Sequence, residues 1–148
     1  MYIIRKENVS MTVDERKALA AKYHRSGYNC AQSVACAFAG DLGFDHDTVY
    51  KMAEGFGLGM GNMECTCGAV SGAVMAAGMK NSDPSVPGST KGSTYKLSRE
   101  INEKFVEKNK SLICADLKGV TTGQVLRSCP GCIDDAVEIL CGVLEMTE

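Results

Sequence analysis

The sequence contains no long hydrophobic run. Its longest apolar stretch, residues 73–79, is far shorter than the roughly 20 residues that a membrane-spanning helix needs. The first residues also lack the apolar core of a secretion signal. We therefore expect a soluble, cytoplasmic protein with no membrane insertion.

An excess of one charge sign is also lacking. The formal net charge is -2 at pH 7, and basic residues alternate with acidic ones along the chain. No basic stripe is present, so we do not expect nucleic acid as a partner. Neither internal repeats nor alternating β-strand patterns of useful length occur.

Helical periodicity and capping residues instead predict an all-α fold. Thr12 with Glu15 forms a capping-box pattern, Asn29 is a suitable N-cap, and Pro130 is at a favoured first-turn position. We predict a compact bundle of about five or six helices. The expected helices cover residues 13–25, 30–39, 45–54, 67–79 and 94–109, with a last helix that begins near Cys129.

Two regions outside these helices have a distinct composition. Glycine occupies every second position from Gly55 to Gly61, which predicts a tight loop in close approach to another segment, before a helix of small residues. The glycine spacing does not match the dinucleotide fingerprint. Residues 111–127 are expected to be irregular. We predict a flexible N-terminal extension over residues 1–12 and a single cysteine-rich helical domain over residues 13–148.

The eight cysteines are too sparse for a secreted disulfide scaffold. In a reducing compartment, clustered cysteines more often serve metal or redox chemistry. Cys36 and Cys141 lie in apolar helical segments, so we expect them to be buried as small hydrophobic residues.

Three other cysteines lie at or near predicted helix starts, namely Cys30, Cys67 and Cys129. Unpaired backbone N–H groups and the helix dipole stabilise a thiolate there, and the thiolate is the form that binds metals and attacks disulfides. Cys114 lies in an irregular segment, which is typical of a ligand supplied by a loop.

Two close pairs leave alternatives open. Cys65 and Cys67 are spaced to reach one metal, and Cys129 and Cys132 form a C-x-x-C pair at a helix start. A thioredoxin fold would need strands, and a zinc ribbon would need a second C-x-x-C.

The two histidines, His24 and His46, lie in charged helical surroundings, and we interpret them as solvated surface side chains. No C-x-x-C-H motif is present, so we expect no covalent haem.

Several of these residues together resemble a known family. Residues 28–34 read Tyr-Asn-Cys-Ala-Gln-Ser-Val, the glycine-rich segment leads into Cys-Gly-Ala-Val-Ser-Gly at residues 67–72, and Cys114 and Cys129 follow. Over about residues 14–145 the chain resembles the four-cysteine CGAxxG proteins, the C_GCAxxG_C_C family. The resemblance implies a helical fold and a redox role, and relatives include the cluster-binding part of split-Soret cytochromes.

The first functional hypothesis is an electron-transfer protein with an iron–sulfur cluster of the 2Fe–2S or 4Fe–4S type. Zinc is a chemically compatible alternative, since four thiolates suit either metal. Its metal ligands are expected to be Cys30, Cys67, Cys114 and Cys129. Backbone groups of glycines are expected to contact the cofactor, namely those of Gly57, Gly59, Gly61 and Gly68.

Two other hypotheses stay open. One is a metal-free thiol–disulfide protein that uses Cys129 with Cys132, or Cys30 with Cys67. The other is a helical interaction protein whose cysteines are buried structural residues. Cys65 or Cys132 could replace a family cysteine in the site. We expect an unidentified redox protein as partner, leave a homodimer open, and name no enzymatic substrate.

Overall fold

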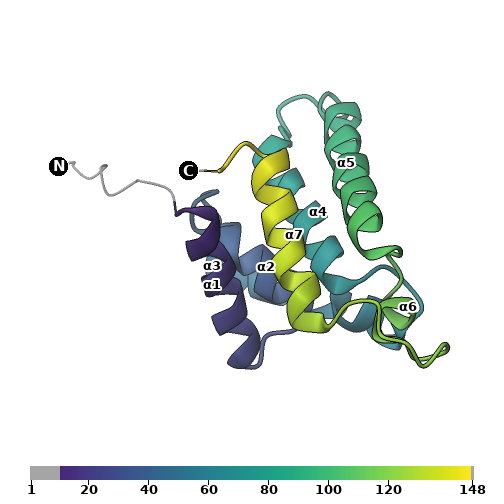
Figure 1. The fold of residues 1–148 in the computed structure, drawn as a ribbon. Coiled ribbons are helices and arrows are strands. Elements are labelled where there is room, and N and C mark those ends of the chain that lie inside the picture. The colour runs from purple at the N-terminus through teal and green to yellow at the C-terminus, as the bar shows by residue number, and fades with distance from the viewer. Residues whose placement is uncertain (1–10, 148) are drawn as a thin grey trace.

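The computed structural model describes residues 11–147, which form a bundle of helices (Figure 1). The α-helices are α1 (Val13–Arg25), α2 (Cys30–Ala39), α3 (His46–Ala53), α4 (Gly68–Asn81), α5 (Lys91–Asn109), α6 (Cys114–Lys118) and α7 (Cys129–Val143). Two short helical turns, η2 (Glu54–Phe56) and η3 (Gly59–Met63), connect α3 to α4. The described residues contain one isolated β-bridge, between Thr66 and Ile113, and no strand. The predicted all-α fold is confirmed.

The helix boundaries differ from the prediction in two places. α6 lies in the segment expected to be irregular, and α5 begins at Lys91 rather than near Thr94. Ile113 before α6 cannot cap a helix with its side chain, and Thr90 before α5 makes no side-chain cap hydrogen bond. The described chain therefore has seven α-helices. Residues 1–10 of the predicted extension lie outside the described residues.

Capping boxes begin the first two helices, which confirms the predicted box at Thr12 and the predicted N-cap at Asn29. The Thr12 hydroxyl accepts from the Glu15 N–H at 3.1 Å, and Asn29 Oδ1 accepts from the Gln32 N–H at 2.9 Å. Asn29 also donates through Nδ2 to the carbonyl oxygen of Glu54 at 2.8 Å, which ties the start of α2 to η2. The position of Cys30, the first residue of α2, is therefore held from two sides.

Helices α2 and α4 pack closely because small residues face each other. A Cβ atom added at Gly72 would lie 2.6 Å from the carbonyl oxygen of Ala31 and 3.2 Å from Cβ of Val34. Ala69 and Ala73 on the same helix are fully buried. The small residues of α4 therefore bring its backbone against that of α2.

Helix α7 is the central element of the bundle. In Figure 1 it lies between α1 and α5, and it also contacts α2 and α4. Its apolar face, with Ile133, Val137 and Leu140, is buried in the main core. Cys141 belongs to this core and Cys36 to a second one between α2 and α3, so the predicted burial of both is confirmed.

The directions of the helices determine where the four candidate cysteines lie. Helix α1 ends at the lower end of Figure 1, and α2, α4, α6 and α7 begin there. Cys30, Cys67, Cys114 and Cys129 mark those four starts. Among residues 11–147, no helix combines the length and the apolar character needed to cross a membrane.

Candidate functional site: a cysteine-lined pocket

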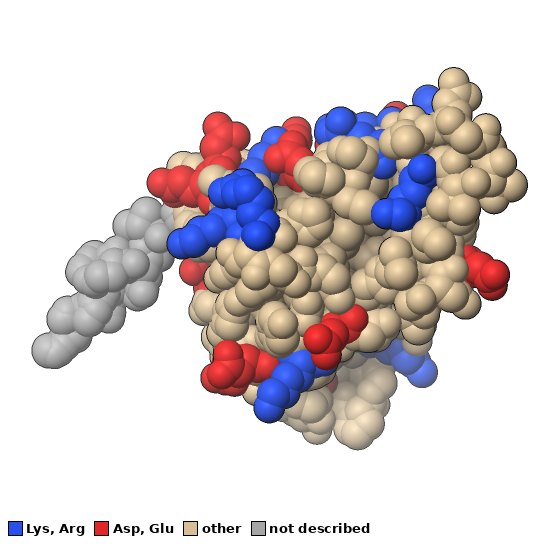
Figure 2. All heavy atoms as spheres, turned by 90° about the horizontal axis from the view of Figure 1, so that it is seen from below, with Lys and Arg blue, Asp and Glu red and all other residues tan. Residues whose placement is uncertain are grey.

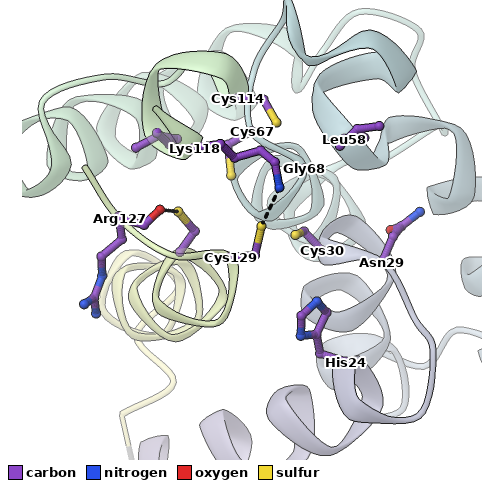
Figure 3. A pocket seen from close by; sticks show the side chains of 12 residues that line it. His24, Asn29, Cys30, Leu58, Cys67, Gly68, Cys114, Lys118, Arg127 and Cys129 are labelled. Carbon is purple, nitrogen blue, oxygen red and sulfur yellow. Dashed lines mark hydrogen bonds between the residues drawn. The ribbon is translucent and has the colours of Figure 1, made fainter. Parts of the chain in front are cut away.

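Five cysteines line one cavity of about 200 Å³ at the meeting point of the helix starts (Figure 3). One water needs about 10–15 Å³ of such space, so the cavity has room for a guest of several atoms. The five are Cys30, Cys67, Cys114, Cys129 and Cys132. The structure thus brings together the four cysteines expected as ligands and adds Cys132, while Cys65 is exposed and does not line the cavity.

Cys67 and Cys114 are brought together by backbone hydrogen bonds between distant segments. The Cys67 N–H donates to the carbonyl oxygen of Leu112 at 2.7 Å, and the Cys114 N–H donates to that of Cys65 at 3.0 Å. These bonds flank the bridge between Thr66 and Ile113. Two segments almost fifty residues apart in the chain are therefore fixed side by side.

The glycine-rich segment forms the two helical turns η2 and η3 rather than an open loop. Leu58, Gly59, Met60 and Gly61 all have positive φ, which permits this tight path. Leu58 lies on the cavity wall. The predicted tight path in close approach to another segment is confirmed, since a run of left-handed residues lets the chain coil between α3 and α4 with Gly57 against Asn29 and Gly59 against Cys114.

The four glycines expected at a cofactor have different surroundings. Gly68 lines the cavity. Gly57 lies against the Asn29 side chain, and a Cβ at Gly59 would lie 2.6 Å from Cβ of Cys114. Gly61 has no atom near the position of a Cβ. Gly57 and Gly59 thus allow close packing, and only Gly68 faces the space where a cofactor would lie.

Replacement of Gly59 by alanine is expected to displace Cys114. Both Gly59 (φ +58) and Gly61 (φ +87) have left-handed backbones, so an alanine at either costs on the order of 1 kcal/mol in strain. Only Gly59 adds a clash with Cys114. If Gly59 positions that thiol, Gly59→Ala will change the rate at which Cys114 is alkylated in the metal-free protein, measured by mass spectrometry, and Gly61→Ala will not. Equal rates in both variants would contradict this role.

Four of the five thiols influence one another's pKa in two sets of neighbours. The pKa values of Cys30 and Cys129 depend most on each other, and so do those of Cys67 and Cys132. Cys114 stands outside both pairs, and burial raises its pKa. The exchanging pairs suggested by the sequence, Cys129 with Cys132 or Cys30 with Cys67, stay predictions, and all four of these cysteines line the cavity.

Each pair has one acidic and one weakly acidic thiol. The hydrogen bond from Cys30 lowers the pKa of Cys129 to about 5, against burial and with help from the charge of Lys118. Lys118 Nζ donates to Cys129 Sγ at 3.5 Å (Figure 3). The hydrogen bond to Cys129, with burial, raises the pKa of Cys30.

The inner pair behaves in the same way. The hydrogen bond from Cys132 lowers the pKa of Cys67, and backbone N–H groups of Ala69 and Val70 at the start of α4 add to this effect against burial. The pKa of Cys132 is raised by the hydrogen bond to Cys67 and by burial. Within these two sets of neighbours, Cys129 and Cys67 are therefore the more acidic thiols.

His24 and Lys118 line the cavity, and no acidic residue among the described ones does; Arg127 lies at the wall through its carbonyl oxygen, while its guanidinium points away and pairs with Asp135 (Figure 3). The prediction that His24 is a solvated surface residue was wrong, since α1 ends at the pocket and His24 is half-buried there. His46 is half-buried too, because its Nε2 lies 2.9 Å from the Tyr28 hydroxyl. The charged residues next to both histidines in the sequence indicated solvated side chains, so the burial of neither was predicted.

Arg127 is held by a buried carboxylate on α7. Asp135 is fully buried and accepts hydrogen bonds from Arg127 Nε at 2.9 Å, Lys108 Nζ at 2.9 Å and Asn109 Nδ2 at 3.1 Å. Cys132 Sγ in turn lies 3.9 Å from the Arg127 carbonyl oxygen. Asp135 therefore connects α5, the segment before α7 and the wall of the pocket.

The pH dependence of stability is expected to follow Asp135. Burial alone would raise its pKa, but the hydrogen bonds from Arg127, Lys108 and Asn109 outweigh burial and lower it. A carboxyl group with a lowered native pKa stabilises the fold above its unfolded pKa of about 3.9 and loses this effect as pH falls through the native value. Asp135→Asn is expected to cost about 1–3 kcal/mol at pH 7 and much less at the lowest pH at which the protein stays folded, measured by urea unfolding.

Asp134 is the matched control on the same helix. It pairs with Lys17 at 3.4 Å and its side chain is 46 % exposed. An exposed pair contributes at most about 1 kcal/mol, so Asp134→Asn should change stability little at either pH. A loss for Asp135→Asn that is the same at both pH values would contradict the assigned ionisation.

The thiols form a ring around a space rather than a closed single-ion site. Within residues 11–147, no group of three or more histidine, cysteine, aspartate or glutamate side chains is arranged to hold a metal ion. A tetrahedral zinc site would need four ligand atoms at about 2.0–2.3 Å from one point.

Comparison with known proteins agrees with this picture of the cysteines. A family model described as "Putative redox-active protein (C_GCAxxG_C_C)" matches residues 28–143 of the chain, a range that contains all eight cysteines. No curated protein and no solved structure matches the chain.

Proposed function

The chain belongs to the C_GCAxxG_C_C family of redox-active proteins, and on this basis we propose that its pocket binds an iron–sulfur cluster for electron transfer. The proposed ligands are Cys30, Cys67, Cys114 and Cys129, since four thiolates are the usual complement for such a cluster. When bound, the cluster would supply a redox couple whose potential depends on its charge, hydrogen bonds and exposure.

The observation that carries the proposal is the convergence of cysteines from four helix starts on one cavity. Cys30, Cys67 and Cys129 lie at the first turns of α2, α4 and α7, where backbone N–H groups and helix dipoles favour negative charge. Cys114 reaches the same cavity at the start of α6. Packing alone does not require polarisable thiols at all four starts.

The size of the cavity favours a cluster over a single ion. Its volume of about 200 Å³ and its ring of thiols leave the centre open. A cluster contains several metal and sulfide atoms, so its ligands lie farther apart than those of one zinc ion. We therefore propose a cluster, and the finding of bound zinc is the alternative result that the test distinguishes.

The charges around the cavity support the same conclusion. A cluster with four thiolate ligands carries net negative charge, and the Lys118 ammonium group supplies the opposite sign at the wall. Lys118 already donates to Cys129 at 3.5 Å. Removal of a positive charge from this wall would disfavour the more negative, reduced form of the site.

An exposed apolar rim beside the cavity suits contact with a redox partner protein. Leu58 on the wall is 46 % exposed, Met60 is 52 % exposed, and Leu126, which is bonded to the carbonyl oxygen of Leu117, is 43 % exposed. Figure 2 views this end, and uncharged residues cover much of it, with charged side chains toward the edges. Electrons exchanged with a partner at this end would travel the shortest distance between the protein surface and the cluster.

Purification without oxygen tests the proposal. We expect a visible absorption band that bleaches on reduction, with iron and acid-labile sulfide bound in equal amounts. Iron-free protein that contains zinc, or no metal after reconstitution with iron and sulfide, would refute it.

A further inference from the structure

We propose that Tyr28 and His46 form a one-electron redox site outside the cysteine pocket, in which Tyr28 gives an electron to a strong one-electron oxidant while its phenolic proton passes to His46. The contact that carries this proposal is the distance of 2.9 Å between the Tyr28 hydroxyl oxygen and His46 Nε2. Neither residue lines the cavity, although Tyr28 precedes Cys30 by only two residues. The inference therefore does not depend on a bound cluster.

The distance between the two side chains suits proton transfer. A base can take a proton when the two heavy atoms lie about 2.6–3.2 Å apart. A neutral imidazole has one ring nitrogen that accepts a proton, and we assign this role to His46 Nε2, with the Tyr28 hydroxyl as the donor. Loss of an electron makes a phenol a far stronger acid, so a base that is already in contact makes the oxidation easier.

The backbone on each side of this contact is fixed independently. His46 is the first residue of α3, and Asp45 Oδ2 caps this helix by accepting from the Thr48 N–H at 2.9 Å. The Tyr28 N–H donates to the carbonyl oxygen of Tyr23, in the last turn of α1, at 3.1 Å. The phenol and the imidazole are therefore held in place before any electron is lost.

Aromatic rings enclose Tyr28 on two sides. The Tyr23 ring is stacked on it, with ring centroids 4.5 Å apart and an interplanar angle of 9°. The Tyr50 ring meets it edge-on, with centroids 4.9 Å apart. These three tyrosines and His46 are all half-buried, so the rings keep part of the surrounding water away from the phenol and leave the imidazole as its near base.

Two carboxylates compensate the charge that His46 would gain. The start of a helix disfavours a cation, because the helix dipole is positive there, and His46 begins α3. Asp45 and Asp47 flank His46 in the sequence and supply the opposite charge. A nearby negative charge favours the charged form of an imidazole.

With photogenerated tris(bipyridine)ruthenium(III) as the oxidant, the step balances in electrons and protons. The ruthenium complex takes one electron from Tyr28 and becomes ruthenium(II). The O–H bond of Tyr28 breaks and an N–H bond forms at His46 Nε2. The products on the protein are a neutral tyrosyl radical and an imidazolium ion.

Laser-flash oxidation of the purified protein by this complex tests the site, with the tyrosyl radical followed by transient absorption. In the wild type we expect rapid formation of the radical, which slows in heavy water because a proton moves with the electron. Tyr28→Phe should lose this rapid phase. Tyr95→Phe is the control, since it changes a tyrosine on α5 that is 56 % exposed, and it should keep the rapid phase.

His46→Ala separates proton transfer from packing. Loss of the base should slow radical formation at Tyr28 by roughly a hundredfold or more. Added imidazole should restore much of the rate, which it would not do if His46 only packed against the ring.

Three results would overturn the proposal. They are a rapid phase that persists in Tyr28→Phe, a wild-type rate that is the same in heavy water, and a wild-type rate in His46→Ala, which would mean that Nε2 donates to Tyr28 instead. The first two remain decisive if His46→Ala does not fold. None of these outcomes depends on whether iron is found.

Discussion

Cys67→Ser is expected to lose most of the bound iron and sulfide and to be clearly less stable than the wild type. Cys67 is the N-cap residue of α4 and is buried at the wall of the cavity. Serine keeps the shape but is a poor ligand for iron, and in metal sites binding free energy contributes to folding free energy. The measurements are iron and sulfide content after anaerobic purification, and the midpoint of urea unfolding.

Cys65→Ser is the matched control for this prediction. Cys65 lies two residues away but is exposed and outside the cavity. The Cys65→Ser variant should keep the iron content and the stability of the wild type. If Cys65→Ser loses iron and Cys67→Ser retains it, the ligand on this segment has been misassigned.

Gly72→Ala is expected to destabilise the protein by about 1–3 kcal/mol, the usual cost of extra atoms in a packed interior. The new Cβ would lie 2.6 Å from the carbonyl oxygen of Ala31, a backbone atom that can move only if α2 moves. Because α2 carries Cys30 and α4 follows Cys67, the same shift should widen the pocket. Chemical denaturation measures the loss of stability.

Gly78→Ala on the same helix should have the opposite sign. Nothing lies within 4 Å of a Cβ at Gly78, and its backbone is an ordinary helix. Alanine is favoured over glycine in a helix by about 0.5–1 kcal/mol, so this variant should gain stability. If both variants lose stability equally, the close approach of α2 and α4 is not the cause.

The sequence was sufficient where short-range chemistry sets the structure. The caps at Thr12 and Asn29 and the buried Cys36 and Cys141 depend on neighbours within one or two turns, and each was predicted. The early start of α5 and the existence of α6 were missed: Thr90 makes no side-chain cap hydrogen bond, and α6 is only five residues long with Ile113 at its N-cap.

The details of the pocket could not be read from the sequence, because long-range packing determines them. The bridge between Thr66 and Ile113 places Cys114 beside the segment of Cys67, and no local sequence pattern predicts this bridge. His24 enters the lining because α1 ends there, and Cys132 joins the lining beside cysteines from distant segments of the chain. The roles of these thiols toward metal remain predictions.

The most direct test of the cysteine pocket as a cluster site is anomalous diffraction at the iron absorption edge from crystals grown without oxygen. We expect anomalous density within the cavity, with the sulfurs of Cys30, Cys67, Cys114 and Cys129 bonded to iron. Crystals of iron-containing protein whose iron lies elsewhere, or whose iron is bound by other residues, would contradict the account.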